Sequence, residues 1–203
     1  MQEGSAVLES HWGGGVSPFA ASWQKTMMWI FIVTDGLLFS ALLCGYGFLR
    51  ASSNTPWPDR TEVFKIWFIA LMTFILITSS MFMGTAVTAA RLGDTKRAFN
   101  NLVYTILGGA CFLGCQAYEW TNIIREGARL NSNPWGAPQF AASFFVLTGF
   151  HGSHVLSGLV ILTITAIRYR MGKTPAQNVE MAGLYWHFVD LVWVFIFTLF
   201  YLL

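Results

Sequence analysis

The sequence is poor in charge, cysteine and histidine, and these shortages exclude several classes of protein before any motif is considered. Only 11% of its 203 residues are charged, whereas soluble domains carry about a quarter. The net charge of +2 comes without a long basic cluster, so no nucleic-acid partner is predicted. The three cysteines all fall in apolar stretches, which fits packing residues and not a disulfide framework or a zinc site. A chain that is 55% hydrophobic and 16% aromatic is instead typical of an integral membrane protein.

Five apolar runs are each long enough to cross a bilayer, for which a helix needs about 20 mostly apolar residues. They cover residues 23–49, 64–90, 99–124, 139–168 and 180–202, and they follow a polar tail over residues 1–22. The connections between them are too short to fold as separate domains. The sequence therefore predicts an all-α fold, a single polytopic membrane bundle of five transmembrane helices over residues 23–203.

The basic residues predict the orientation, because Lys and Arg accumulate in cytoplasmic loops. The side of the N-terminus carries Lys25, Arg91, Lys96, Arg97, Arg168, Arg170 and Lys173, against Arg50, Arg60, Lys65, Arg125 and Arg129 on the other. We therefore expect the N-terminus in the cytoplasm and the C-terminus outside. Three arginines lie at span ends: Arg91, Arg97 and Arg168. They could bind lipid headgroups, or their side chains could extend to the membrane interface without binding a lipid.

Small residues spaced four apart predict where the helices approach one another, since close contact in lipid relies on such residues. The second span offers Ser80, Gly84 and Thr88, and the third offers Gly114 beside two of the cysteines. These stripes indicate a compact bundle.

Polar residues inside the apolar runs are the candidate functional residues, because such groups are costly in hydrocarbon and normally face other helices or a hydrated path. The set comprises Asp35, Gln116, Glu119, His151, His154, Glu180, His187 and Asp190. His187 and Asp190 are three apart and so share one helical face, as do His151 and His154.

Four interpretations of these residues are open. If their faces converge, His151, His154, His187 and Asp190 could hold a metal ion, and a haem would need His151 or His154 opposite His187. The simpler interpretation, in which each side chain hydrogen-bonds to a facing helix, is the one we predict, with no metal. A small proton-coupled carrier using Asp35 and Asp190 is the alternative function, although the sequence shows neither the repeats nor the broken helices of many transporters.

Three stretches together resemble subunit III of the haem–copper terminal oxidases, the cytochrome c oxidase and quinol oxidase subunit III family. Residues 148–155, Thr-Gly-Phe-His-Gly-Ser-His-Val, are similar to its histidine-containing signature. Residues 183–190, Gly-Leu-Tyr-Trp-His-Phe-Val-Asp, with Trp193 and the late Tyr201, are similar to its C-terminal signature. Residues 113–120 resemble the Gln-x-x-Glu-aromatic segment of a middle helix. The resemblance extends over all five spans and implies the five-helix bacterial form.

The resemblance implies a non-catalytic subunit of an aerobic respiratory oxidase, which reduces oxygen to water and couples this to proton translocation. Such a subunit has no catalytic residue and no redox centre. Haem and copper are expected in partner subunits, and bound phospholipids in this one. The implied partners are the catalytic subunit I, other oxidase subunits and membrane lipids, with a respiratory supercomplex as a further possibility. The implied location is a bacterial inner (plasma) membrane, and the implied role is to stabilise subunit I and support proton uptake. The intramembrane polar residues then have structural or electrostatic roles.

The sequence departs from the family pattern at two points. Asp35 occupies a position where many cytochrome c oxidase members carry Glu, while members of the quinol-oxidase branch also carry Asp; both electron donors therefore stay open. The five spans also lack two N-terminal helices of the mitochondrial form, which build one wall of a lipid-filled cleft. Another subunit, or lipid alone, would fill that place here.

Overall fold

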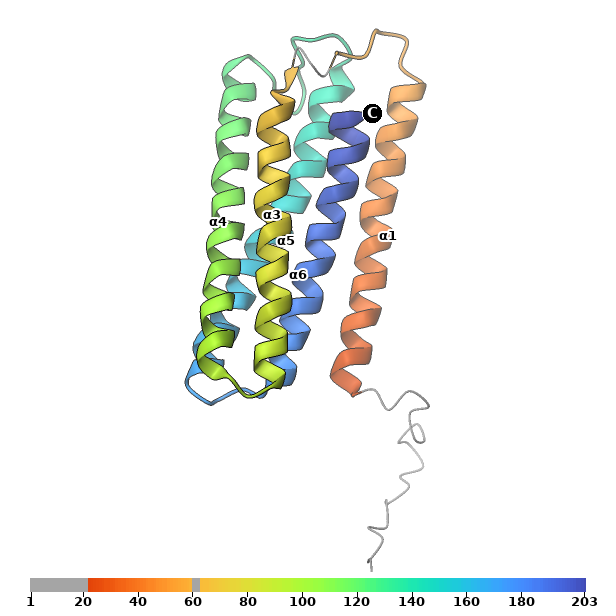
Figure 1. Cartoon of the computed structure of the whole chain (residues 1–203). Helices are drawn as coiled ribbons and strands as arrows, with labels where there is room; N and C mark the ends of the chain where they lie inside the picture. Colours follow the sequence, from red (N-terminus) through yellow and green to blue (C-terminus); the bar gives the residue numbers. More distant parts are fainter. Residues whose placement is uncertain (1–21, 60–62) are drawn as a thin grey trace, which may run out of the picture.

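The computed structural model describes residues 22–59 and 63–203, so the predicted polar tail up to residue 21 lies outside the described residues. In this part of the chain, long helices stand side by side in alternating directions (Figure 1). They are α1 (Trp23–Ala51), α3 (Ile66–Arg91), α4 (Thr95–Arg125), α5 (Pro138–Arg170) and α6 (Ala176–Ile196), which continues as the π-helix η1 (Phe197–Leu202). Among the described residues, five helices are long and apolar enough to cross a membrane. The predicted all-α membrane bundle is therefore confirmed.

α4 and α6 begin before the predicted apolar runs, whereas α1 begins at the predicted residue and α3 slightly after it. Polar residues that hydropathy excludes can still cap or continue a helix. The side chain of Ser22 accepts a hydrogen bond from the backbone N–H of Lys25 at the start of α1. At the start of α4, Asp94 Oδ1 accepts from the N–H of Arg97 at 2.9 Å, which satisfies an otherwise unpaired donor. Residue 180, where the last run was predicted to start, is already inside α6, which begins after Pro175.

Two tight turns at the same end of the bundle join α3 to α4 and α5 to α6. Each turn contains a glycine with positive φ, 78° at Gly93 and 68° at Gly172. Residues with a Cβ atom adopt this conformation only at a cost, so glycine is the natural choice at both turns.

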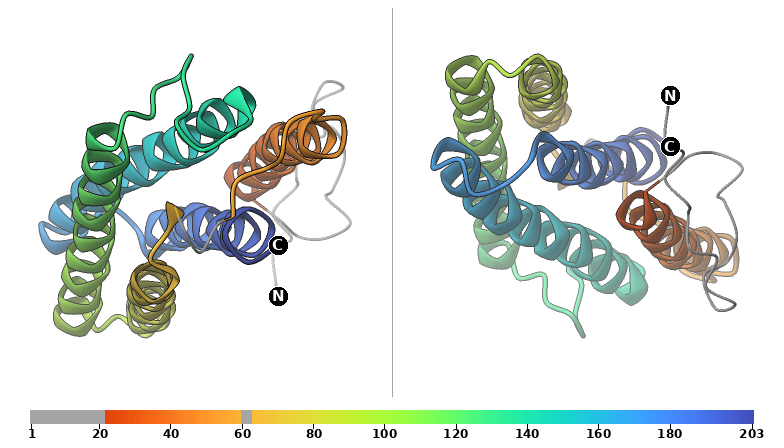
Figure 2. Two further views of the ribbon diagram at one scale, coloured as in Figure 1. Left: turned by 90° about the horizontal axis from the view of Figure 1, so that it is seen from above. Right: turned by 90° about the horizontal axis from the view of Figure 1, so that it is seen from below.

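Helix α6 occupies the centre of the bundle and α1 its periphery. Viewed along the helices, α6 lies between α3, α5 and α1, whereas α1 stands at the edge (Figure 2). In the most apolar 18-residue segment of α6 and η1, 50% of the residues are buried, whereas in that of α1 only 11% are. The large buried side chains of Trp186 and Trp193 come from α6, so this helix supplies much of the core.

Some of the closest helix contacts lie outside the predicted small-residue stripes, although Ser80 of one stripe does contact α6. A Cβ atom added to Gly108 of α4 would lie 2.7 Å from Ser79 Cβ of α3, and one added to Gly109 would overlap the ring of Trp186. Gly84 and Gly114 have open space instead. The stripes were therefore wrong at these two glycines, because spacing along one helix does not reveal which face its neighbour covers.

Candidate functional site

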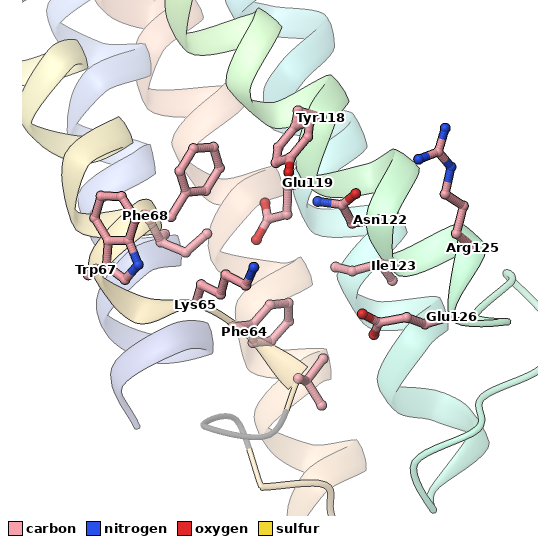
Figure 3. Close-up of a pocket in the computed structure, with 12 residues that line it drawn as sticks. Phe64, Lys65, Trp67, Phe68, Tyr118, Glu119, Asn122, Ile123, Arg125 and Glu126 are labelled. Atoms are coloured by element: carbon pink, nitrogen blue, oxygen red, sulfur yellow. The ribbon is translucent and has the colours of Figure 1, made fainter.

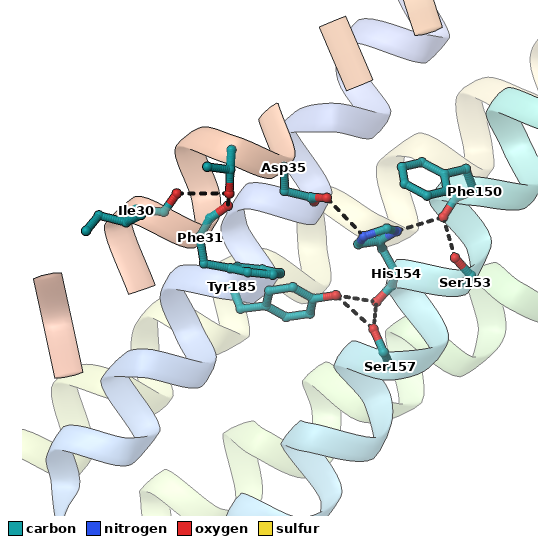
Figure 4. A network of polar contacts seen from close by, with 9 residues as sticks. Ile30, Phe31, Asp35, Phe150, Ser153, His154, Ser157 and Tyr185 are labelled. Atoms are coloured by element: carbon teal, nitrogen blue, oxygen red, sulfur yellow. Dashed lines mark hydrogen bonds and ion pairs between the residues drawn. The ribbon is translucent and has the colours of Figure 1, made fainter. Parts of the chain in front are cut away.

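A carboxylate–imidazole pair joins the peripheral α1 to α5. Asp35 Oδ1 lies 3.3 Å from His154 Nε2, and Asp35 is only 5% exposed. Phe39, one turn further along α1, packs its ring against the His154 ring with centroids 5.2 Å apart. Figure 4 shows the two side chains pointing toward each other across the gap between the helices.

The second ring nitrogen of His154 bonds to its own helix. Nδ1 lies 2.8 Å from the carbonyl oxygen of Phe150, and a carbonyl can only accept, so Nδ1 is the donor. This bond fixes the orientation of the ring and directs Nε2 toward Asp35.

Tyr185 of α6 ties this pair to the central helix. Its hydroxyl lies 3.1 Å from the carbonyl oxygen of His154 and 2.8 Å from Ser157 Oγ. α1, α5 and α6 therefore meet at one polar cluster at the level of Asp35, which Figure 4 shows from close by.

His151 lies one turn away from His154 in an aromatic environment. Its side chain is fully buried, and its ring centroid is 5.8 Å from that of Phe112 and 5.1 Å from that of Trp193. Neither ring nitrogen has a hydrogen-bond partner among the described residues. Such a group is exceptional in a folded protein, and its observed neighbours here are aromatic rings.

Gln116 and Trp120 of α4 both bond to Thr148 of α5. Gln116 Nε2 donates to the Thr148 carbonyl oxygen at 2.9 Å, and Trp120 Nε1 donates to its hydroxyl at 3.1 Å. The Thr148 hydroxyl in turn donates to the carbonyl oxygen of Phe144, one turn earlier. These bonds fix the register of α4 against α5.

Glu119 of α4 is bound by the last turn of the chain. The Tyr201 hydroxyl donates to Glu119 Oε2 at 3.2 Å, and Tyr201 itself is fully buried. The Tyr201 ring packs against Phe64, with centroids 4.8 Å apart. The late tyrosine of the C-terminal signature is thus the partner of the carboxylate in the middle-helix segment.

Two tryptophans of α6 donate to hydroxyl groups of α3. Trp186 Nε1 bonds Ser79 Oγ at 3.2 Å, and Trp193 Nε1 bonds Thr73 Oγ1 at 2.9 Å. Both pairs are buried, where an indole N–H without an acceptor would be costly. They hold the two antiparallel helices at two levels of the bundle.

His187 and Asp190 meet the same helix on a more open face. Ser80 Oγ is hydrogen-bonded to His187 Nδ1 and also contacts the Asp190 side chain. His187 is exposed, and Asp190 Oδ1 has no partner among the described residues. The shared face that we expected is present, and it is directed toward α3 and not toward the histidines of α5.

Glu180 lies at the end of the bundle where α1 and α6 begin. Its Oε1 is 2.7 Å from Lys25 Nζ and 3.0 Å from Arg91 Nη2, so one carboxylate joins α1, α3 and α6. Beside it, Gln177 Nε2 donates to Ser22 Oγ. The lipid candidates Arg91, Arg97 and Arg168 are all exposed at this same end, and of these Arg91 is the one seen in an ion pair with Glu180.

The predicted site residues therefore form several separate contacts and not a single centre. Asp35 pairs with His154, Glu119 with Tyr201, and His187 with Ser80. Across residues 22–59 and 63–203, no three His, Cys, Asp or Glu side chains come together in a way that could hold a metal ion. The four-ligand convergence needed for a metal is thus not seen in this part of the chain, and His187 contacts Ser80 of α3 and not the histidines of α5.

Sequence reasoning missed several partners of these residues. Thr73, Ser79 and Thr148 looked like ordinary small polar residues of apolar helices, and Lys25 entered only the count of basic residues. A usable signal did exist for the first two. Trp186 and Trp193 are seven apart on one helix while Ser79 and Thr73 are six apart on another, as expected if two antiparallel helices bond at two levels.

The bundle and its buried polar contacts define a class, that of polytopic membrane proteins held together by intramembrane hydrogen bonds and ion pairs. Comparison with known proteins identifies the family. The family model described as cytochrome c oxidase subunit III matches residues 6–203.

Individual relatives are similar over nearly the whole chain. Quinol oxidase subunit 3 of Bacillus subtilis (strain 168) is 37% identical over 179 residues, covering 86% of this chain and 84% of that protein. Cytochrome c oxidase subunit 3 of Bacillus sp. (strain PS3) is 35% identical over 178 residues, 86% of this chain and 83% of the other. Cytochrome bo(3) ubiquinol oxidase subunit 3 of Pseudomonas putida is 34% identical over 190 residues, 90% and 87% of the two chains.

The chain therefore belongs to the cytochrome c oxidase subunit III family. It is a multi-pass membrane protein and a non-catalytic component of a haem–copper oxidase complex.

Proposed function

We propose that this subunit packs against the catalytic subunit I of an aerobic respiratory oxidase in a bacterial plasma membrane, stabilises it, binds phospholipid and supports proton uptake. The observation that carries the proposal is the family match over residues 6–203. The relatives named above come from bacteria, which supports the plasma membrane. Haem and copper belong to the partner subunits in this proposal. The N-terminus lies in the cytoplasm, on the side with more Lys and Arg.

The intramembrane polar residues act structurally and electrostatically in this proposal. Asp35 with His154, Gln116 with Thr148, and Glu119 with Tyr201 each connect two elements of the bundle. His151 packs within the core, and Glu180 closes one end. His187 and Asp190 differ from the others because they lie on an open face at bilayer depth, where a polar group normally has a partner. That face is where a helix of another subunit would dock.

Arg91, Arg97 and Arg168 would bind the phosphates of lipids in the cytoplasmic leaflet. Their exposure at one end of the bundle supports this assignment, as does the general attraction of basic side chains to anionic lipid. Arg91 would share its charge between lipid and Glu180.

Affinity purification of this chain in mild detergent tests the proposal. We expect subunit I to co-purify, with a Soret absorption band and oxygen consumption. Oxidation of cytochrome c or of a quinol by the purified complex then identifies the electron donor, for which the relatives provide examples of both kinds. A colourless, lone polypeptide that stays monodisperse on size exclusion would contradict the proposal.

The alternative of a proton-coupled carrier has less support. It requires Asp35 and Asp190 to act on one path, but Asp35 contacts α5 and Asp190 contacts α3, on different faces of α6. The family match also favours the oxidase subunit. Uptake of substrate by liposomes that contain this chain alone would be needed to restore the carrier.

A further inference from the structure

One side of the bundle leaves part of the central helix uncovered. Figure 2 shows α6 between α3 and α1, and three of its side chains, those of His187, Leu191 and Phe195, are exposed. On the neighbouring flank of α3 lie Ser80, which contacts His187, and Gly84, one turn further along. We call these five residues together the α3–α6 face.

His187 is a polar group at a depth where lipid offers it no hydrogen bond. It lies about 15 Å or more from either end of the span Ala176–Leu202, and it is exposed. Its Nδ1 is hydrogen-bonded to Ser80 Oγ, whereas its Nε2 forms no hydrogen bond within residues 22–59 and 63–203. Because an unpaired polar atom in hydrocarbon is costly, the ring needs a hydrogen-bonding group from outside this part of the chain.

The surface of α3 beside His187 is built from small residues. A Cβ atom added to Gly84 would meet no atom within 4 Å, and Thr88, one turn further, is exposed. The packing of α3 on α6 uses other residues of α3, since a Cβ atom added to Gly183 of α6 would lie 3.2 Å from the Met83 side chain. Small residues let the backbone of a second helix approach closely. Gly84 therefore marks a place where such a helix can cross α3.

The other flank of α3 is covered by α4. Between these two helices, near one end of the bundle, lies a cavity of about 540 Å³, which Figure 3 shows from close by. Its basic residues Lys65 and Arg125 stand at helix ends. Nearer the middle of the bundle, α4 is so close that a Cβ atom on Gly108 would lie 2.7 Å from Ser79 Cβ. The α3–α6 face is thus the side of α3 that is free to receive another helix.

We propose that the α3–α6 face docks one transmembrane helix of another oxidase subunit. That helix crosses α3 at Gly84, presents a hydroxyl or carboxamide side chain to His187 Nε2, and packs aliphatic side chains against Leu191 and Phe195. This inference rests on the proposed function, because it requires the chain to be part of an oxidase complex.

The chemistry of the partner side chain follows from the two tautomers of the imidazole. A neutral imidazole donates from one ring nitrogen and accepts at the other. The hydroxyl of Ser80 can accept from Nδ1 of His187 or donate to it, so Nε2 is an acceptor in the first case and a donor in the second. A hydroxyl or carboxamide both donates and accepts, and it satisfies either tautomer. An ammonium only donates and a carboxylate only accepts, and both are costly at this depth.

Photo-cross-linking in the assembled complex tests this first. A benzophenone amino acid replaces Leu191, which is 55% exposed beside His187, or in the control Leu107 of α4, which is 60% exposed. Mass spectrometry then identifies what each position is joined to after illumination. We expect the probe at Leu191 to join a membrane-spanning segment that has Ser, Thr, Tyr, Asn or Gln within one turn of the attachment point. The probe at Leu107 should not join that segment.

Variants separate the hydrogen bond from the shape of the face. His187→Leu should lower the amount of partner subunit retained after dilution in detergent by about threefold, the average effect of one interhelical hydrogen bond in a membrane. His187→Gln keeps a group that donates and accepts, and should recover most of this loss. Gly84→Leu fills the crossing point and should lower retention about tenfold. Gly114→Leu is the matched control, because a Cβ atom there also meets open space, and it should change nothing.

The same variants are unfolded as isolated chains in dodecyl sulfate micelles, where Gly84→Leu should behave like the unmodified protein. A loss of retention that is matched by an equal loss of stability in this assay would overturn the proposal, because the face would then serve folding alone. Equal retention by Gly84→Leu and the unmodified chain would show that no helix crosses there.

Two outcomes distinguish this proposal from the proposed function. If the probe at Leu191 joins lipid alone in a complex that retains haem and oxygen consumption, the proposed function stands and the docking of a helix is wrong. If it joins a membrane-spanning segment in a preparation without haem, the docking face is supported and the proposed function is contradicted.

Discussion

Removal of Asp35 should weaken the attachment of α1 to the rest of the bundle. α1 buries little of its surface, and its polar contacts to the other helices lie near its start, at Ser22 and Lys25, and at its middle, where Asp35 meets His154. Loss of the middle contact leaves the His154 ring nitrogen without an acceptor or donor in a buried place. We therefore expect Asp35→Ala to lower the free energy of unfolding.

The size of the effect follows from the geometry of the pair. At the observed 3.3 Å, two opposite unit charges would attract by about 5 kcal/mol at an effective dielectric constant of 20. Desolvation offsets most of this gain, and interhelical hydrogen bonds in membranes contribute about 0.6 kcal/mol on average and about 1.7 at most. Because Asp35 is almost fully buried, we expect a value near the upper limit, about 1.5 kcal/mol.

A double-mutant cycle measures this coupling directly. Asp35→Ala, His154→Ala and the double variant are unfolded in mixed micelles with increasing mole fraction of dodecyl sulfate, followed by tryptophan fluorescence. Asp35→Asn adds a test of charge, because its amide can donate to Nε2 and should recover part of the loss. Ser40→Ala is the control, since this hydroxyl bonds only within α1, and it should be additive with His154→Ala.

Two outcomes of this cycle would contradict the role of the Asp35–His154 pair. If the coupling between Asp35→Ala and His154→Ala stays within about 0.5 kcal/mol of zero, as for independent sites, the pair does not hold α1. If Asp35→Asn restores stability completely, a neutral polar contact suffices and the charge of Asp35 contributes nothing to the attachment of α1.

Three further variants test other contacts in the same unfolding assay. Glu180→Gln should lose about 0.5–1 kcal/mol, because its cationic partners are largely exposed, and 1 M salt should shrink this loss; a loss that salt leaves unchanged would contradict ion pairing. Tyr201→Phe should lose about 1–3 kcal/mol because Glu119 then keeps no donor, and a silent variant would show that the carboxylate has another partner. Gly109→Val would force a side chain into Trp186 and should lose about 1–3 kcal/mol; an unchanged midpoint would mean that the tryptophan can move aside.

Hydropathy was sufficient to predict the number of spans, because the membrane imposes length and apolarity on each helix separately. It was less informative about helix ends, which depend on polar caps such as Asp94 and on helical but polar residues such as Gln177. Glu180 illustrates the consequence. It was expected within the span, yet it lies where α6 has only just begun and where lysine and arginine from two other helices can reach it.

The partners of the polar residues could not be predicted, since they depend on rotation of one helix against another. The sequence indicates that His187 and Asp190 share a face, but not that Ser80 lies opposite. It indicates that Gly114 is small, but not that Gly108 is the glycine against which α3 packs. Motif resemblance identified Glu119 and Tyr201 separately, and only the structure joins them.

The central place of α6 has a consequence for the order of membrane insertion. This helix follows the other four in the chain, so those helices enter the bilayer before the central helix exists, although α4 can already pack against α3 and α5. Until α6 arrives, Thr73 and Ser79 lack their indole donors and Glu119 lacks Tyr201. The hydroxyls of Thr73 and Ser79 meanwhile keep their bonds to backbone carbonyls within α3, so the contacts that await α6 are the interhelical ones. A truncation before α6 should loosen α1 and α3, which contact α6, more than it loosens the packing of α4 on α3 and α5.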